Sequence, residues 1–315
     1  MKTPLISIII PCYNGEHFIE NAIHSCIQET YQNVEIIVID DGSKDTSKKV
    51  VENLSHQLSQ IKPIFQENKG VCAARNAGLE IAKGDFFIFL DADDILLPNS
   101  IFHLVELQKE TNTDVVVGLT TLNTKKELLK NDFSFFEYLD NPIASLIKKW
   151  WPISAVMVRN NKIKWDETMK VWEVVDYFFR LLLEYNFSCT FTDYYVSQIN
   201  DYENEDRITT AYNHYEPINS AKFFARLYQM LKQNNKIDYQ KTEALNYQLM
   251  NFVYQAFQNN LTIEKYIYQS IQRKQLKTAS NFKSTGLTGW CYFFGVEKGM
   301  KLFFQANKVK SLFIK

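Results

Sequence analysis

Residues 34–45 read Val34-Glu35-Ile36-Ile37-Val38-Ile39-Asp40-Asp41-Gly42-Ser43-Lys44-Asp45, an apolar run that ends in acidic and turn-forming residues. A short run rich in β-branched residues is typical of a strand buried on both faces, as in a parallel sheet. The segment Asp40–Ser43 indicates a loop and the N-cap of a helix. The stretch therefore predicts a strand, a loop and a helix in succession, with carboxylates at the end of the strand.

The same succession recurs on both sides of this stretch. Leu5–Ile10 and Phe86–Leu90 predict further buried strands, and shorter strands are predicted near Ile64 and over 115–117. Apolar residues at helical spacing fill the intervals, over 16–29, 44–60, 71–82 and 100–109. Strands that alternate with helices four or five times predict the α/β class, with a mostly parallel sheet and flanking helices.

The pattern changes after about residue 120. Residues 120–150 are polar and irregular, 153–159 are compatible with a strand, and 173–185 show strong helical spacing. From about residue 216 the chain is rich in Gln, Asn, Tyr and Lys, with helical spacing and few strand signals. We therefore predict a domain over about 1–210, divided near residue 120, and a helical C-terminal extension over 211–315.

The composition argues against several classes of protein. Basic and acidic residues are balanced, 35 against 36, which gives no reason to expect nucleic acid as a partner. The five cysteines are scattered without a Cys-x-x-Cys pair, so we expect reduced thiols rather than a disulfide framework or a zinc site. Neither a signal-peptide-like segment nor 18 consecutive apolar residues occurs, so we expect a cytoplasmic protein without a membrane-spanning helix.

Polar clusters follow three of the predicted strands. Asn14-Gly15 follows the first strand, Asp40-Asp41 the second, and Asp91-Ala92-Asp93-Asp94 the strand that ends at Leu90. Ligands of an open parallel sheet bind beyond the carboxyl ends of its strands, so these clusters should share one crevice. Converging carboxylates need a hard cation, and Mg²⁺ or Mn²⁺ takes oxygen ligands and bridges phosphates. A metal and a diphosphate are the expected occupants, and the lack of a Walker-type loop excludes a P-loop site.

Five segments together resemble the family 2 glycosyltransferases, which share the Rossmann-like GT-A fold. They are Ile8–Gly15, Ser25–Tyr31, Glu35–Asp45, Asn68–Gly78 and Leu90–Pro98. The third contains Asp-Asp-Gly-Ser, the fourth Ala-Arg-Asn-x-Gly and the fifth Asp-x-Asp. The resemblance is specific over about 4–120, weaker over 150–200 and absent beyond. It implies that about 1–120 binds a nucleotide sugar and about 121–210 binds the acceptor.

The resemblance also implies roles for individual residues around the nucleotide. Pro11, Tyr13 and Asp41 lie where the family holds the nucleobase, usually uracil. Tyr13 would pack on the ring, and Asp41 would accept from the base N3–H. Arg75 lies where the family has an arginine beside the nucleotide, and a structural ion pair within the same crevice is its alternative role.

The acidic run has three different implied roles. Asp91 would reach the ribose or the shell of the metal, and Asp93 would bind the Mn²⁺ or Mg²⁺ that bridges the two phosphates. The cation would neutralise charge on the departing nucleoside diphosphate. Asp94 is expected to cap a helix or to support the other two.

The catalytic base is the weakest part of the resemblance. Inverting members often use the Asp of a Glu-Asp pair at the start of a helix, with an Arg seven residues after the Glu. Glu173 and Arg180 have this spacing, but Val174 occupies the Asp position and cannot accept a proton. Either Glu173 or Asp176 supplies the base, since both lie near one face of the helix, or activity is weak or lost. Both carboxylates are also compatible with a solvated helix N-terminus.

The tail over 276–315 is basic and aromatic. It carries seven lysines and eight aromatic residues, with Glu297 as its one acidic residue. One interpretation is an amphipathic surface that contacts the anionic inner face of the membrane, near a lipid-linked acceptor. The other is a packed helical end with a solvated lysine face.

The predicted function is metal-assisted transfer of a sugar, with inversion, from a nucleotide sugar to a hydroxyl of a glycan or lipid-linked acceptor. The resemblance favours a UDP-linked donor and, in bacteria, a role in cell-envelope polysaccharide assembly. The alternative is a non-catalytic module that keeps the nucleotide site but lacks the base, which Val174 supports. A nucleotidyltransferase is disfavoured because Pro11–Gly15 lacks a glycine- and Arg/Lys-rich phosphate loop.

Overall fold

The computed structural model describes residues 3–124, 128–130, 138–201, 217–259, 261–272, 291 and 296–301. The chain divides into two compact units, Met1–Leu139 with Trp150–Glu203, and Asp140–Lys149 with Asn204–Lys315. Residues 140–149 thus group with the C-terminal helices, whereas the sequence placed them in the first domain.

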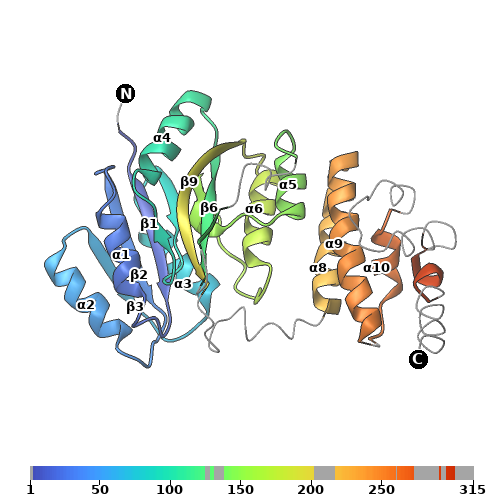
Figure 1. Cartoon of the computed structure of the whole chain (residues 1–315), viewed down its shortest axis with the longest axis horizontal. Helices are drawn as coiled ribbons and strands as arrows, with labels where there is room; N and C mark the ends of the chain where they lie inside the picture. Colours follow the sequence, from blue (N-terminus) through green and yellow to red (C-terminus); the bar gives the residue numbers. More distant parts are fainter. Residues whose placement is uncertain are drawn as a thin grey trace. The chain divides into compact units, whose positions relative to one another are not determined.

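The first unit is built on a mixed sheet with the strand order β3-β2-β1-β4-β8-β6-β9-β5 and with β7 paired to β6 (Figure 1). The strands that the structure describes are β1 (Ile6–Cys12), β2 (Val34–Asp40), β3 (Ile61–Phe65), β4 (Phe86–Phe89), β5 (Ile95–Leu96), β6 (Val115–Thr124), β7 (Leu128–Lys130), β8 (Val156–Arg159) and β9 (Cys189–Asp201).

The first four strands form the parallel sheet that the sequence predicts. β1 pairs with β2 from Ile6 opposite Val34 to Cys12 opposite Asp40, and β4 lies on the other side of β1. Beyond β4 the sheet becomes mixed, because β8 runs antiparallel to both β4 and β6. The region predicted to be irregular, 120–150, contains the end of β6, strand β7 and a short helix, and the long strand β9 was not predicted.

Helices cover both faces of the sheet. Ile8 and Ile10 of β1 pack in one cluster with apolar residues of α1 (Ile19–Ile27), α2 (Ser47–Gln57) and α4 (Ser100–Thr111). Ile9 points to the opposite face, where it contacts α3 (Val71–Ile81) at Gly78. The 3-10 turn η2 (Ile153–Ala155) precedes β8, and α6 (Glu173–Leu183) packs Tyr177 against Phe89 of β4. Because successive side chains of a strand point to opposite faces, this one sheet packs against a layer of helices on each face.

The second unit is helical over its described residues, as predicted. It contains α5 (Pro142–Lys148), α8 (Pro217–Gln233), α9 (Tyr239–Gln258) and α10 (Lys265–Ser270). The buried side-chain amide of Gln248 on α9 donates to the Ile147 carbonyl at 2.9 Å and to the Lys148 carbonyl at 3.2 Å, which ties α9 to the end of α5.

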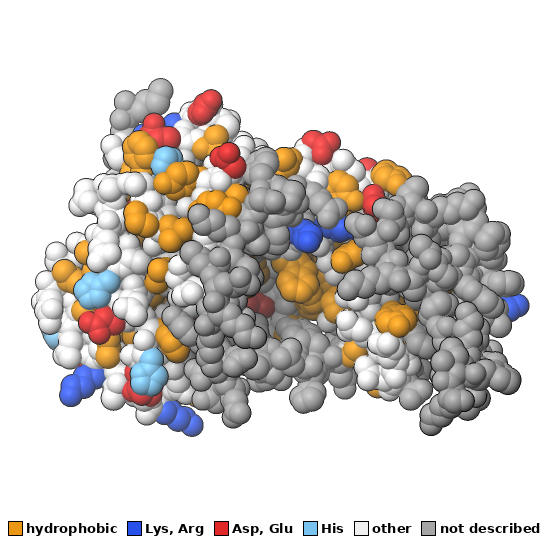
Figure 2. Space-filling view, in the orientation of Figure 1, with side chains coloured by type: hydrophobic (Ala, Val, Ile, Leu, Met, Phe, Trp, Pro, Cys, Tyr) orange, Lys and Arg blue, Asp and Glu red, His pale blue; other side chains and the backbone are white. Residues whose placement is uncertain are grey.

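The basic-aromatic tail falls mostly outside the described residues, which include only 291 and 296–301 from it, so its contact with a membrane stays a prediction. Across the helices that the structure describes, none combines the length and the apolar character needed to cross a bilayer. On the face drawn in Figure 2, the described acidic and basic side chains are scattered, without a gathering of one sign.

The cysteines are free thiols, as the sequence predicts. Burial raises the pKa of Cys12, Cys26, Cys72 and Cys291 to about 12. These four side chains therefore stay protonated near neutral pH, which makes them poor nucleophiles and poor metal ligands.

Candidate active site

Hydrogen bonds join the loops that follow β1 and β2 at the carboxyl edge of the sheet. The Asn14 side-chain oxygen accepts from the Lys44 N–H at 2.9 Å, and the Asn14 N–H donates to the Ser43 hydroxyl at 3.0 Å. Asn14 has a φ of 51°, a left-handed conformation that asparagine tolerates. Pro11 is buried in β1, whereas Tyr13 stays 46% exposed and offers an aromatic surface at this edge.

Asp41 connects the end of β2 to the start of α3. Its Oδ1 accepts from the Gln66 side chain at 2.7 Å and from the Lys69 N–H at 2.9 Å, and its Oδ2 accepts from the Gly70 N–H at 2.8 Å. A carboxylate oxygen can accept about two hydrogen bonds, so Oδ2 keeps one acceptor position beyond the Gly70 bond. Asp41 therefore orders the loop before α3 and retains the capacity to accept from a ligand.

The acidic run 91–94 forms a turn in which the Asp94 N–H donates to the Asp91 carbonyl at 3.0 Å. Asp94 is buried and accepts from the Ser154 hydroxyl at 3.1 Å. Burial, followed by the charges of Asp91 and Asp93, raises the pKa of Asp94 well above its usual range. The charges of Asp91 and Asp93 add to the larger effect of burial, and a bound cation would offset this local negative charge.

Arg75 joins the acidic turn to the start of α6. Its guanidinium is buried, lies 4.6 Å from the centre of the Trp165 ring, and donates to Asp91 Oδ1 at 3.0 Å. A second guanidinium nitrogen lies 3.5 Å from Glu173 Oε1. The structure thus brings together three of the predicted site residues, Arg75, Asp91 and Glu173, from three separate elements.

The two candidate bases on α6 have different surroundings. Glu173 lies in the first turn, and its side chain is 20% exposed beside Arg75. Asp176 is buried, and its Oδ2 accepts from Arg180 Nε at 2.7 Å. Val174 offers no proton acceptor. Of the two carboxylates, Glu173 is therefore the one that the structure places in contact with another predicted site residue.

Three supporting residues were missed by the sequence reasoning. Trp165 underlies Arg75, Ser154 bonds to Asp94, and the Asn200 side-chain nitrogen donates to the Asp93 carbonyl at 2.8 Å. Asn200 is oriented in turn by the Asn123 amide, which donates to its side-chain oxygen at 3.1 Å. No sequence motif marks these residues, and Asn200 lies on the strand β9 that was not predicted.

The carboxylates fit a cation that arrives with its ligand. Among the residues described, no group of three or more His, Cys, Asp or Glu side chains is placed to hold a metal. Mg²⁺ usually binds proteins through one or two carboxylates, with substrate phosphates and waters as its other ligands, and oxygen ligands suit Mn²⁺ equally. Asp91 and Asp93, whose charges add to the effect of burial on the pKa of Asp94, supply the one or two carboxylates of that incomplete type of site.

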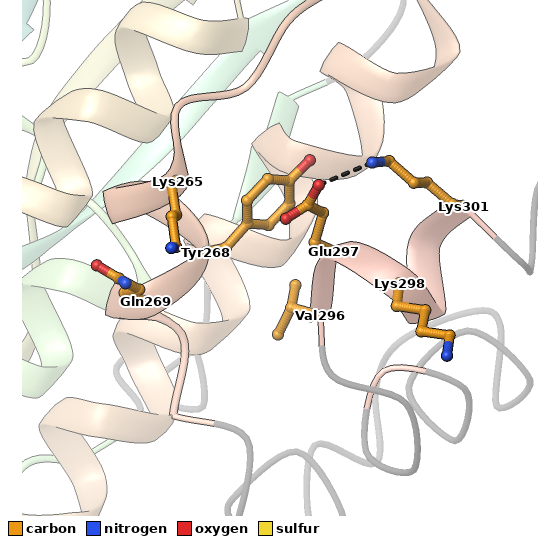
Figure 3. Close-up of a pocket in the computed structure, with 7 residues that line it drawn as sticks. All are labelled: Lys265, Tyr268, Gln269, Val296, Glu297, Lys298 and Lys301. Atoms are coloured by element: carbon orange, nitrogen blue, oxygen red, sulfur yellow. Dashed lines mark hydrogen bonds and ion pairs between the residues drawn. The ribbon is translucent and has the colours of Figure 1, made fainter.

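A separate cavity of about 510 Å³ lies in the second unit. Figure 3 shows its lining residues, Lys265, Tyr268, Gln269, Val296, Glu297, Lys298 and Lys301. Lys301 pairs with Glu297 at 2.7 Å, and burial raises the pKa of the Tyr268 phenol. None of the predicted site residues lines this cavity. Its lining has three lysines and one carboxylate, whereas the carboxyl edge of the sheet is acidic.

Comparisons with known proteins identify the family and the fold of the chain. Residues 7–174 match the family model described as Glycosyl transferase family 2. Over 97 residues the chain is 47% identical to an uncharacterised glycosyltransferase of Haemophilus influenzae. That alignment covers 30% of this chain and 39% of the relative, so the matched part spans about two fifths of the relative's length.

Solved structures are similar over nearly the whole chain. S. aureus TarS 1–349 in complex with UDP-GlcNAc has a TM-score of 0.71 at 17% identity, over 96% of this chain and 92% of that chain. The mannosyltransferase PcManGT from Pyrobaculum calidifontis, in complex with GDP-Man and Mn²⁺, has a TM-score of 0.59 at 13% identity, over 100% and 89%. These similarities confirm the predicted GT-A fold with a helical C-terminal part. Because the family model spans more than half of the 315 residues, the chain belongs to Glycosyl transferase family 2, the family that its sequence motifs resemble.

Proposed function

We propose that the chain transfers a sugar from a UDP-sugar to a hydroxyl of a glycan or lipid-linked acceptor, with inversion at the anomeric carbon. The contact series Asp91–Arg75–Glu173 is the observation that carries the proposal. It links the acidic turn, where a diphosphate and its cation would bind, to a carboxylate on a different element. A donor site and a base within one ion-pair network are what a displacement at a sugar carbon requires.

The nucleobase would bind between Tyr13 and Asp41. The exposed Tyr13 ring suits stacking on a planar base, and the remaining acceptor position of Asp41 Oδ2 suits the N3–H of uracil. Pro11 would form the floor beside them. The UDP-GlcNAc bound by TarS, a protein of the same fold, supports this choice of nucleotide.

Asp93 would bind Mn²⁺ or Mg²⁺, with Asp91 reaching the ribose or the metal shell. The cation, when bound, would neutralise negative charge on the diphosphate as it leaves. Asn200 holds the Asp93 backbone through its bond to the carbonyl, so the ligand carboxylate would start from a fixed position. The Mn²⁺ bound with GDP-Man by PcManGT supports a metal of this type.

Glu173 would act as the base. The acceptor oxygen forms a bond to the anomeric carbon while the bond from that carbon to the diphosphate oxygen breaks. The hydroxyl proton passes to Glu173, and the electron pair of the broken bond leaves with UDP. Arg75 would position the Glu173 carboxylate, since a buried guanidinium fixes the direction of the side chains that it contacts.

Metal-dependent donor binding tests the first half of this proposal. A thermal-shift panel of nucleotide sugars with and without Mn²⁺ should show stabilisation by a UDP-sugar that requires the metal. Asp93→Ala should abolish both the metal-dependent shift and the release of UDP. No response to any nucleotide would exclude the proposed donor site.

Val174 specifically favours a second candidate, a nucleotide-sugar-binding module without catalysis. That module would show the same metal-dependent binding of a UDP-sugar but would release no UDP with any acceptor or with water. Release of UDP above the Asp93→Ala background would exclude this candidate.

A further inference from the structure

Two tryptophans of the first unit form an aromatic pair at the start of α6. The rings of Trp150 and Trp172 lie 4.6 Å apart, edge to face at 80°. Trp150 is 50% exposed, whereas Trp151 and Trp165 are buried. An indole that stays half in water keeps part of its aromatic surface available to a ligand.

The backbone at Trp172 also holds this ring in an uncommon conformation. Trp172 is the N-cap of α6 and has a φ of 62°, in the left-handed region that bulky side chains rarely adopt. Glycine or asparagine would adopt this conformation at lower cost. Strained residues gather at ligand sites, and here the strain sets an aromatic ring directly before Glu173 in the chain.

Glu173 is linked to the donor side and to the aromatic pair in different ways. Its carboxylate contacts Arg75, which leads to Asp91 and the proposed donor. The residue directly before it in the chain is Trp172, whose ring packs on that of Trp150. An acceptor that gives its hydroxyl proton to Glu173 has to lie beside this carboxylate, at the start of α6 where the aromatic pair lies.

We propose that Trp150 and Trp172 form the acceptor subsite, and that the acceptor unit is a pyranose ring. This inference rests on the proposed function. One face of a hexopyranose carries a row of C–H groups, and their partial positive charge packs well on the negative face of an indole. An acyclic polyol phosphate has no such face, so it would gain little from the pair.

Saturation-transfer NMR tests whether this aromatic pair binds a pyranose ring, and it does not require turnover. The probes are methyl hexopyranosides and, in parallel, glycerol phosphate and ribitol phosphate, each with the full chain, UDP and Mn²⁺. We expect saturation of pyranoside ring protons by the wild type and by Trp150→Phe, and at least a fivefold loss with Trp150→Ala. Tyr185→Ala removes another exposed aromatic of the same unit, 52% exposed, and should leave the signal unchanged.

The UDP proton signals from the same samples distinguish failure of the acceptor subsite from failure of the proposed donor site. Saturated UDP together with pyranoside signals that do not differ between wild type and Trp150→Ala would overturn the subsite and leave the proposed function standing. Preferential saturation of the polyol phosphates would also overturn it. Absence of any UDP signal would instead remove the donor site and the subsite together.

Discussion

At the residue scale, Glu173 and Asp176 should respond differently to loss of charge. Glu173→Gln should lower the rate of transfer by at least about a hundredfold, within the range for loss of a general base, and leave UDP-sugar binding in place. Asp176→Asn should cost about 3 kcal/mol of stability because it removes the buried negative charge that pairs with Arg180. Single-turnover transfer and urea denaturation measure the two effects. Equal loss of transfer in both variants at equal stability would contradict the assignment of the base.

Glu29 should make stability depend on pH. It is buried, accepts from the Ser100 N–H at 3.0 Å, and burial raises its pKa to about 7. The folded protein then holds a proton that the unfolded chain, with a carboxyl pKa of 4.5, has lost, so the free energy of unfolding falls as pH rises from about 4.5 to 7. Glu29→Gln keeps an acceptor for Ser100 and removes the ionisation.

The variant should therefore be more stable than the wild type above pH 7, by on the order of 1–3 kcal/mol. Below pH 4.5 this advantage should vanish. Urea denaturation at pH 5 and pH 8 measures the difference, and Glu20→Gln, at an exposed position of α1, serves as the control. A difference between Glu29→Gln and wild type that is the same at both pH values would rule out the titration of Glu29.

The residue scale also shows what could be predicted about the site. Asp41, Arg75 and the acidic turn follow apolar strands or open a helix, so their place at one edge follows from the topology of a parallel sheet. The pairing of Arg75 with Glu173 could not be predicted, because it joins side chains about a hundred residues apart. The contact that now distinguishes Glu173 from Asp176 is therefore a product of tertiary packing.

At the scale of elements, α3 depends on a close approach to the sheet. A Cβ at Gly78 would lie 2.5 Å from Ile9 Cγ2 and 3.0 Å from Ile39 Cδ1. Gly78→Ala should therefore destabilise by about 1–2 kcal/mol, because the overpacking exceeds the roughly 1 kcal/mol gain in helix propensity. Since α3 also carries Arg75, displacement of the helix should weaken UDP-sugar binding.

A double-mutant cycle checks this cause. In an Ile9→Ala background, which removes the nearest atom, the cost of Gly78→Ala should become smaller, and the free energies of unfolding from urea melts give the coupling. Additive costs would show that the clash with Ile9 is not the source of the effect.

Elements were predictable where their periodicity is simple. β1, β2 and β4 are continuous apolar runs and α3 is a helix of small residues, and all were predicted close to their observed bounds. β9 was missed because its ladder with β6 contains register shifts around Leu119, which interrupt the alternation that marks a strand. Gly118 permits the approach, since a Cβ there would lie 2.7 Å from Val196.

At the scale of the whole molecule, the chain passes between its two units more than once. It leaves the first unit after Leu139, contributes Asp140–Lys149 to the second, and returns at Trp150. All the proposed site residues belong to the first unit, so donor binding should need only that unit. The helix α5 nevertheless packs on α9, which lies about a hundred residues later in the chain. A division of the sequence at a single point cannot show this pairing.

A chain that ends at residue 210 should therefore be less soluble and less stable than the full protein. Ile143, Leu146 and Ile147 of α5 are buried and belong to the second unit, and in the shortened chain α5 would lose α9, against which it packs. Each fully buried aliphatic side chain contributes about 1.5–3 kcal/mol, so their exposure favours aggregation. Replacing residues 140–149 of the shortened chain by a Gly/Ser linker should restore solubility and metal-dependent UDP-sugar binding, as measured by size-exclusion chromatography and thermal shift. If the shortened chain without the linker matches the full protein in both measurements, α5 does not depend on α9, and the two units are separable by a single cut.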